Sequence, residues 1–178
     1  MDIVIRQARP EEYESVGEIT AQAYLGDGLL DFGESDEYLG ELRDVAKRAE
    51  AADVLVAVMG AEAGAGAGAG ERVVGGVTFV PSGGPMADIA RDGEAEIRML
   101  AVAKAARGRG VGEALVRACV ARARATDGCV RVVLSTQRTM HSAHRIYGRL
   151  GFTRAPDRDW NPIPDLDDIM LLTYELTL

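Results

Sequence analysis

The residues best suited to chemistry gather where a strand-like run meets a glycine turn and a helical pattern. The run Glu96 to Val102 leads into Arg107-Gly108-Arg109-Gly110-Val111-Gly112, and the helical pattern begins at Glu113. Glycine lets the backbone approach a ligand closely, and the first N–H groups of a helix have no partner within the helix. This stretch therefore predicts an anion site, most simply a phosphate site.

The charge around this turn supports the same prediction. Lys104 to Arg124 holds six basic residues against the single acid Glu113, although the whole chain has a net charge of −8. A solvated helix face accounts for some of these arginines, but not for Arg107 and Arg109 inside the turn. An acidic protein that concentrates positive charge at one glycine turn is expected to bind a polyanion there.

Composition excludes several classes of protein. The chain has 178 residues, of which 47% are hydrophobic and 27% charged, as in an ordinary globular domain. The acidic balance argues against general nucleic-acid or anionic-membrane binding. We see no apolar run long enough for a membrane span and no signal-peptide pattern, so we expect a cytoplasmic protein. Cys119 and Cys129 are expected to be core residues without a disulfide.

Hydrophobic periodicity predicts an alternation of strands and helices. Strands are expected at 2–8, 53–59, 73–80, 96–102, 130–136, from 152, and at 169–178, and helices at 10–24, 37–51, 111–126 and 140–150. This order predicts an α/β (α+β) fold with a mixed, mostly antiparallel sheet of about seven strands and about four helices on its faces. We expect one domain, 1–178, in which the glycine/alanine repeat at 61–70 is a flexible hairpin loop without a function of its own.

Two common phosphate motifs do not fit the turn. A Walker loop needs a lysine and a hydroxyl residue after its last glycine, but Gly112 precedes Glu113 and Ala114. A dinucleotide fingerprint needs G-x-G-x-x-G, and the third glycine is missing whether counting begins at Gly108 or at Gly110.

A third pattern, R-x-x-G-x-G, is met by Arg107, Gly110 and Gly112 directly after a strand that contains M-L-A-V. Farther along, residues 147–152 read Y-x-x-L-G-F. This pair of motifs resembles the GCN5-related N-acetyltransferase (GNAT) superfamily, closely over 94–154 and in element order over nearly the whole chain. The resemblance implies a fold in which the central strand and the one after it, 130–136, splay apart.

The resemblance also implies that acetyl-CoA is the cosubstrate. Its pyrophosphate would lie against the backbone N–H groups of Gly108, Arg109, Gly110, Val111 and Gly112, with added charge from Arg107 and Arg109. The backbone of Leu100, Ala101 and Val102 would pair with the pantetheine arm. Family members often have an asparagine seven residues before the motif tyrosine. Here that residue is Met140, so its hydrogen bond is expected to be absent or to move to Thr136 or Ser142.

Three groups are candidates for the chemistry of acetyl transfer to an amine. The N–H of Leu100 would polarise the thioester carbonyl. Glu96, four residues earlier and so on the same face of a regular strand, would be the base that deprotonates the amine. A carboxylate paired with Arg98 is the alternative for Glu96, and Glu94 is a weaker candidate base.

Tyr147 would protonate the departing CoA thiolate, as the matching tyrosine commonly does in the family. Because it shares a helix face with Ile146 and Leu150, a core aromatic is the alternative. His141 and His144 are further possible proton carriers, although such residues more often lie at a helix start or on a wet face. Two histidines three residues apart, without a third ligand, do not support a metal site, so no metal is expected.

In this fold the acceptor enters between two loops, which here are the acidic segments 25–36 and 156–168. We expect a cationic primary amine, on a small molecule or a protein, with Trp160 as one wall of its pocket. Loops that are merely solvated and charged are the alternative. A non-catalytic acyl-CoA sensor on the same fold is the alternative function. The sequence leaves monomer and homodimer open.

Overall fold

The computed structural model describes residues 2–60 and 70–178. Its strands are β1 (Ile3–Gln7), β2 (Asp53–Met59), β3 (Arg72–Val80), β4 (Glu94–Val102), β5 (Arg131–Thr136), β6 (Thr153–Arg154) and β7 (Leu172–Thr177). Its α-helices are α1 (Tyr13–Gly26), α2 (Tyr38–Arg43), α3 (Val45–Ala51), α4 (Val111–Arg124) and α5 (His141–Arg149). Apart from Gly70, the hairpin loop predicted at 61–70 lies outside the described residues.

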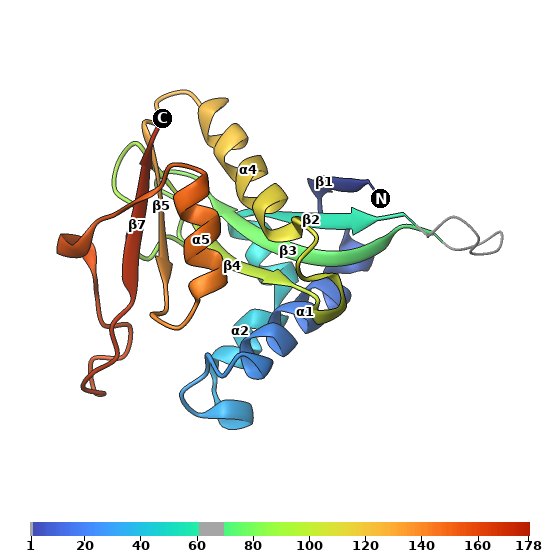
Figure 1. Ribbon diagram of the computed structural model, residues 1–178, viewed down its shortest axis with the longest axis horizontal. Coiled ribbons are helices and arrows are strands. Elements are labelled where there is room, and N and C mark those ends of the chain that lie inside the picture. The colour runs from blue at the N-terminus through green and yellow to red at the C-terminus, as the bar shows by residue number, and fades with distance from the viewer. Residues whose placement is uncertain (1, 61–69) are drawn as a thin grey trace.

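All seven strands form one sheet in the order β1-β2-β3-β4-β5-β7-β6, and only the pair β4–β5 is parallel. Helices α4 and α5 lie on one side of the sheet, and α1 and α2 lie on the other (Figure 1). The predicted mixed, mostly antiparallel sheet with helices on both faces is confirmed.

The prediction of one continuous helix over 37–51 is wrong. The chain forms two short helices, α2 and α3, separated at Asp44, whose backbone leaves the helical region with ψ of 68°. The Asp44 carboxylate accepts a hydrogen bond from the backbone N–H of Lys47 at 3.1 Å, which caps the start of α3. An aspartate that satisfies an unpaired N–H at a helix start favours this break over a continuous helix.

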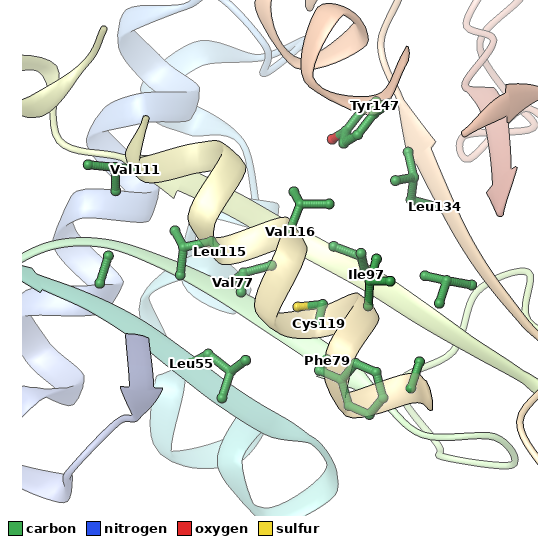
Figure 2. Packing of buried hydrophobic residues seen from close by; sticks show 14 of the residues in the cluster. Leu55, Val77, Phe79, Ile97, Val111, Leu115, Val116, Cys119, Leu134 and Tyr147 are labelled. Atoms are coloured by element: carbon green, nitrogen blue, oxygen red, sulfur yellow. The ribbon is translucent and has the colours of Figure 1, made fainter. Parts of the chain in front are cut away.

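The main core lies between α4 and the sheet. Val111, Leu115 and Cys119 lie at helical spacing on α4 and are buried against β2, β3 and β4. Figure 2 shows this stripe beside Val77, Phe79 and Ile97 of the sheet. Helical spacing in the sequence predicts Val111, Leu115 and Ala118 for the inward face; the first two are buried, but Ala118 is only partly buried and Cys119 is the core residue instead. Both cysteines are free thiols.

Strands β4 and β5 are paired over less than half of β4. The parallel ladder joins Glu94–Ile97 to Arg131–Leu134 and goes no further, although β4 continues to Val102. On its other edge β5 pairs with β7 along its whole length, and Figure 1 shows both strands turned away from the last part of β4. The predicted splay is confirmed, and it leaves the last part of β4 open along one edge.

A β-bulge interrupts β4 where the splay begins. The register with β3 shifts by one residue between Gly76 and Thr78, and Met99 adopts a positive φ of 54°. After this extra residue, Leu100 and Val102 pack with Ile97 on the α4 side, whereas Met99 packs against α1 and α2. The prediction that Glu96 and Leu100 share a face is therefore wrong, since a bulge reverses the alternation of side chains.

Candidate active site

The glycine turn adopts the backbone that its sequence predicts. Gly108 and Gly110 have φ of 75° and 83°, a region that L-residues with side chains rarely adopt, and Gly110 is the N-cap of α4. Gly112 lies against α5, where a Cβ would come within 3.2 Å of Ile146 Cδ1. Glycine at these places lets the unpaired N–H groups of α4 face a cavity, not a side chain.

This first cavity has a volume of about 630 Å³. Its walls are the glycine turn, the backbone of Leu100 to Val102, the C-terminal end of α1 and the first turns of α5. A positive helix end and an open strand edge therefore face the same space. Together they fit a long ligand that carries phosphate at one end and amide groups along its length.

The side chain of Arg107 is engaged on the protein. Its two terminal nitrogens donate to the carboxylate of Asp27 at 2.8 and 3.0 Å, and its Nε donates to the Val102 carbonyl at 3.3 Å. Asp27 follows directly after α1, so this ion pair bridges the turn and the first acidic loop. The guanidinium predicted to contact pyrophosphate thus already has an anionic partner.

A second cavity, of about 590 Å³, lies beyond β4 on the side of the acidic loops. Glu96, Tyr147 and Thr136 line it, and so does Trp160, whose Nε1 donates to Ser135 Oγ at 2.9 Å. The two cavities share the wall residues Tyr24, Leu29, Leu100, Thr139 and Met140. They therefore meet at Leu100, where β4 is open.

Glu96 is buried, with 1% of its surface exposed, and its carboxylate is held on one side only. Oε2 accepts three hydrogen bonds, from the backbone N–H groups of Asp88, Ile89 and Ala90 at 2.9 to 3.0 Å. Burial raises the pKa of Glu96, and these N–H groups offset only part of the rise. The result is a fixed carboxylate at a cavity wall with an increased affinity for a proton.

Arg98 does not form the ion pair with Glu96 that the sequence left open. It pairs with Asp88 at 3.1 Å and donates to the Met86 carbonyl at 2.7 Å and to the Tyr38 hydroxyl at 3.3 Å. Arg98 therefore fixes the loop at residues 86 and 88. The backbone N–H groups of residues 88–90 in the same loop hold Glu96.

Glu94 is bound in an ion-pair network at the other end of the strand. Its carboxylate accepts from Arg158 at 2.8 and 2.9 Å, from Arg131 at 3.0 Å and from the Arg91 backbone N–H at 3.0 Å. Burial acts to raise its pKa, but the bonds from Arg158, Arg91 and Arg131 outweigh it and bring the pKa to about 2. Glu94 lines neither cavity, so its surroundings suit a structural role better than that of a base.

Tyr147 is a core aromatic that also lines the second cavity. Only 3% of its surface is exposed, and its ring packs 5.8 Å from Phe152 and 5.5 Å from Tyr174, between ring centroids. It is a core aromatic on α5 beside Leu134 (Figure 2) and also part of the second cavity's wall. Burial raises its pKa well above the ordinary tyrosine value, so the phenol keeps its proton at neutral pH.

The two hydroxyl residues proposed in place of the asparagine have different surroundings. Thr136 is buried, and its Oγ1 lies 3.2 Å from His144 Nε2 and 3.4 Å from Met140 Sδ. Ser142 is exposed in the first cavity and accepts a bond from Arg145 at 3.1 Å. His141 also lines the first cavity.

The second cavity is lined by more acids than bases. The predicted loops contribute Asp31, Asp36 and Asp168, and the sequence prediction missed Glu41 and Asp88 from elsewhere. Arg98 and Arg138 are the basic residues of its wall. Several loop acids lie elsewhere, such as Asp159, which pairs with Arg154 at 2.8 Å. Tyr24 of α1 and Tyr38 of α2 add aromatic surface to the wall. Neither residue was predicted from the sequence to belong to the site.

Within residues 2–60 and 70–178, no group of three or more His, Cys, Asp or Glu side chains is arranged to hold a metal ion. In the same part of the chain, no helix has the length and apolar character to span a membrane.

Comparison with known proteins identifies the family. Residues 29–152 match the Acetyltransferase (GNAT) family, and the chain belongs to that family. A search of the curated proteins gives no match.

Solved structures of the same fold cover nearly the whole chain. A GNAT-family acetyltransferase from Staphylococcus aureus Mu50 has a TM-score of 0.69 at 15% identity, over 99% of both chains. A putative acetyltransferase from Salmonella typhimurium, solved with its cofactor acetyl-CoA, has a TM-score of 0.67 at 21% identity, over 100% of this chain and 95% of its own. An N-acetyltransferase from Thermoplasma acidophilum, in complex with coenzyme A, has a TM-score of 0.65 at 16% identity, over 100% of both chains.

Proposed function

We propose that this protein transfers the acetyl group of acetyl-CoA to a primary amine by direct attack in a ternary complex. The observation that carries the proposal is the meeting of two cavities at Leu100, with the glycine turn in one and Glu96 and Tyr147 in the other. Acetyl-CoA would fill the first cavity and the amine the second. The thioester would then lie at Leu100, between them.

The chain's own groups fit each part of acetyl-CoA. The pyrophosphate would bind the N–H groups at the start of α4. Arg107 would exchange one of its hydrogen bonds to Asp27 for a hydrogen bond to the pyrophosphate. The pantetheine arm would lie along the open edge of β4, where backbone groups have no strand partner after Ile97. Leu100 also has no register partner on β3, because of the bulge. Its N–H is thus a donor for the carbonyl oxygen as negative charge develops there.

Glu96 is the proposed base. A primary amine arrives as an ammonium ion, with a pKa of about 10.4 for a lysine-type group, and must lose a proton before it attacks. A carboxylate whose pKa is raised by burial accepts that proton more readily than an exposed one, directly or through water. The three backbone donors on Oε2 fix the group, so Oε1 is the oxygen proposed to face the amine.

Tyr147 is the proposed acid. When the tetrahedral intermediate collapses, the C–S bond breaks and the CoA sulfur leaves as a thiolate. A phenol that burial keeps protonated supplies the proton that this sulfur needs. Its position in the wall of the second cavity, next to the shared residues, supports this assignment.

The acceptor is proposed to be a cationic amine. The wall of the second cavity holds acids from five segments of the chain, and Tyr24, Tyr38 and Trp160 provide surfaces for cation–π contact. These groups suit an acceptor whose reacting amine arrives as an ammonium ion and whose other groups are also polar or cationic.

The test is acetyl-CoA turnover with a panel of amines, measured as released thiol, together with thermal shift by CoA, ATP and NAD. Saturation at 100 times Kd should stabilise the protein by about 2.7 kcal/mol. Stabilisation by CoA together with turnover of a cationic amine would support the proposal. Binding without turnover of any amine would favour a non-catalytic acyl-CoA sensor, and stabilisation by ATP or NAD alone would overturn both.

A further inference from the structure

A small set of residues belongs to the walls of both cavities and so surrounds the place where the cavities meet. The set is Tyr24, Leu29, Leu100, Thr139 and Met140. Only Tyr24 and Thr139 among them have a side chain that can donate a hydrogen bond. Thr139 is exposed, whereas Tyr24, in the last turn of α1, is half-buried. Tyr24 is therefore the shielded side-chain donor at this junction.

The Tyr24 hydroxyl is available to a ligand. Within residues 2–60 and 70–178, no side chain or backbone group forms a hydrogen bond with it. The ring packs against Tyr38 of α2, with 6.3 Å between ring centroids. The Tyr38 hydroxyl, by contrast, accepts a hydrogen bond from Arg98 at 3.3 Å. Packing thus positions the Tyr24 ring, while its O–H has no partner among the described residues.

Two cations act on this phenol. Burial raises the pKa of Tyr24, the phenols of Tyr38 and Tyr147 raise it further, and the charges of Arg98 and Arg48 oppose part of the rise. The net rise keeps the proton on the Tyr24 oxygen at neutral pH. Positive charge nearby also makes that O–H a stronger donor to an oxygen that becomes negative.

Arg48 is a buried cation with no carboxylate partner among the described residues. Only 3% of its surface is exposed, and its terminal nitrogens donate to two neutral oxygens, Thr78 Oγ1 at 3.0 Å and the Leu42 carbonyl at 2.7 Å. Its Nε has no hydrogen-bond partner. A buried charge that is not neutralised is costly, and solvent screens its field less than at the surface. Negative charge that develops beside Tyr24 would be stabilised by this field.

We propose that the Tyr24 hydroxyl donates a hydrogen bond to the carbonyl oxygen of the acetyl group, as a second donor beside the N–H of Leu100. The other reacting atoms have partners already, since Glu96 takes the proton of the amine and Tyr147 gives one to the sulfur. The amine must keep its lone pair free for the attack, so a donor there would slow the reaction.

The carbonyl oxygen is the atom at the junction that gains negative charge. When the amine attacks, the C=O π electrons move onto this oxygen, and they return when the C–S bond breaks. Two donors stabilise the oxyanion better than one. Tyr24 keeps its own proton throughout, so it is a catalytic residue without being an acid or a base.

This inference rests on the proposed function, and calorimetric titration with two ligands separates them. The ligands are CoA and acetonyldethio-CoA, an unreactive ketone in which a methylene group replaces the sulfur of acetyl-CoA. If the wild-type protein does not bind CoA, or turns over no amine, the proposed function fails first. If it does both, Tyr24→Phe should weaken ketone binding about five- to tenfold and leave CoA affinity unchanged, because only the ketone has the acetyl carbonyl.

Infrared spectroscopy of the bound ketone gives a second readout. A carbonyl that is labelled with ¹³C gives a separate band, and each hydrogen bond that it accepts moves this band to lower frequency. The band should therefore lie at higher frequency in Tyr24→Phe than in the wild type. A change in packing alone would not remove a hydrogen bond from this oxygen.

Turnover gives the third readout. Tyr24→Phe should lower kcat/KM about 100-fold, the usual effect of removing one donor to an oxyanion. The shape of the pH profile should not change, because Glu96 remains. Tyr13→Phe is the matched control, since it removes a hydroxyl from the same helix, and Tyr13 lines neither cavity. It should keep the wild-type turnover and both affinities.

Three results would overturn the inference. Wild-type kcat/KM in Tyr24→Phe would show that the hydroxyl takes no part in the reaction. Equal losses of CoA and ketone affinity would indicate a structural role. Reduced turnover with an unmoved carbonyl band and wild-type ketone affinity would assign the phenol to another reacting atom.

Discussion

Glu96 and Leu100 lie four residues apart on β4, yet their side chains leave opposite faces of the sheet. The bulge at Met99 causes this, since it adds one residue between the pair on this strand alone. The side chain of Leu100 is thereby packed under α4 with Ile97, and its backbone has no register partner on either neighbouring strand. The carboxylate of Glu96 stays on the α1–α2 side. In the proposed reaction, the bulge thus places Leu100 on the side of β4 that binds acetyl-CoA and leaves Glu96 on the side that binds the amine.

Replacing Glu96 with Gln should reduce kcat/KM at pH 7.5 by about 100-fold or more, the usual contribution of a positioned base. The amide oxygen of Gln can still accept the three N–H groups of the 88–90 loop, so the fold and CoA affinity should be retained. Steady-state kinetics and calorimetric CoA binding measure the two effects. Wild-type turnover in this variant would remove Glu96 from the mechanism.

The pH dependence gives an independent check of the same group. Only ionised Glu96 can take a proton, so wild-type kcat/KM should rise with pH through its pKa, which lies above the ordinary value of 4.5. This limb of the profile should disappear in Glu96→Gln. A limb that persists in the variant would belong to another group.

Replacing Tyr147 with Phe should lower kcat roughly 100-fold while the KM for acetyl-CoA changes little. Among the described residues, no side chain or backbone group hydrogen-bonds the phenol, so its loss should change the free energy of unfolding by less than about 1 kcal/mol. Tyr174→Phe is the matched control, because that ring packs against Tyr147. Equal loss of activity in both variants would indicate a packing effect in place of acid catalysis.

The glycine turn could be predicted from the sequence because its structure depends on local properties. Positive φ at Gly108 and Gly110, and free N–H groups at the start of α4, follow from residue type and helix geometry alone. The same holds for Val111 and Leu115, which helical spacing places on the apolar face of α4.

The surroundings of the catalytic candidates could not be predicted in the same way, because they depend on contacts between distant segments. No local signal places a bulge at Met99, whose positive φ is stabilised by packing against α1 and α2. The three N–H groups on Glu96 come from an irregular loop, and the partner of Arg107 is Asp27, eighty residues away. Likewise, His144 contacts Thr136 only because α5 packs back on the end of β5.

Replacing Asp27 with Asn should tighten CoA binding about two- to fivefold. The carboxylate now pairs with Arg107 and repels a polyanion in the same cavity, so its neutralisation removes both effects. Because both partners are partly exposed, the free energy of unfolding should change by less than about 1 kcal/mol. Arg107→Ala should weaken CoA binding, and the gain from Asp27→Asn should shrink at high salt. Equal CoA affinity in wild type and Asp27→Asn would show that Asp27 does not oppose the ligand.

Replacing Gly110 with Ala should destabilise the protein by about 1–2 kcal/mol and weaken CoA binding. Its φ of 83° strains any residue with a Cβ, and relaxing the strain turns the N–H groups at the start of α4 away from the cavity. Gly148→Ala is the matched control. Gly148 lies within α5 with open space around a Cβ, so alanine there should stabilise the helix by about 0.5–1 kcal/mol and leave CoA affinity unchanged. Urea unfolding should thus give stability changes of opposite sign for the two variants. Calorimetry should show weaker CoA binding in Gly110→Ala alone.

Replacing Glu94 with Gln should cost roughly 2 kcal/mol at pH 7, since it leaves the guanidinium of Arg158, which is 9% exposed, without its carboxylate partner. The pKa of Glu94 is lowered from 4.5 to about 2 in the folded protein. Its ionised form therefore stabilises the fold at pH values above about 4.5, and this stabilisation is lost as the pH falls toward 2. Urea unfolding of wild type and variant should accordingly differ most at pH 7 and converge near pH 2 to 3. Asp92→Asn, an exposed change in the neighbouring turn, should leave stability within about 0.5 kcal/mol of wild type. A constant difference between wild type and Glu94→Gln across this pH range would mean that packing, and not the charge of Glu94, accounts for its effect.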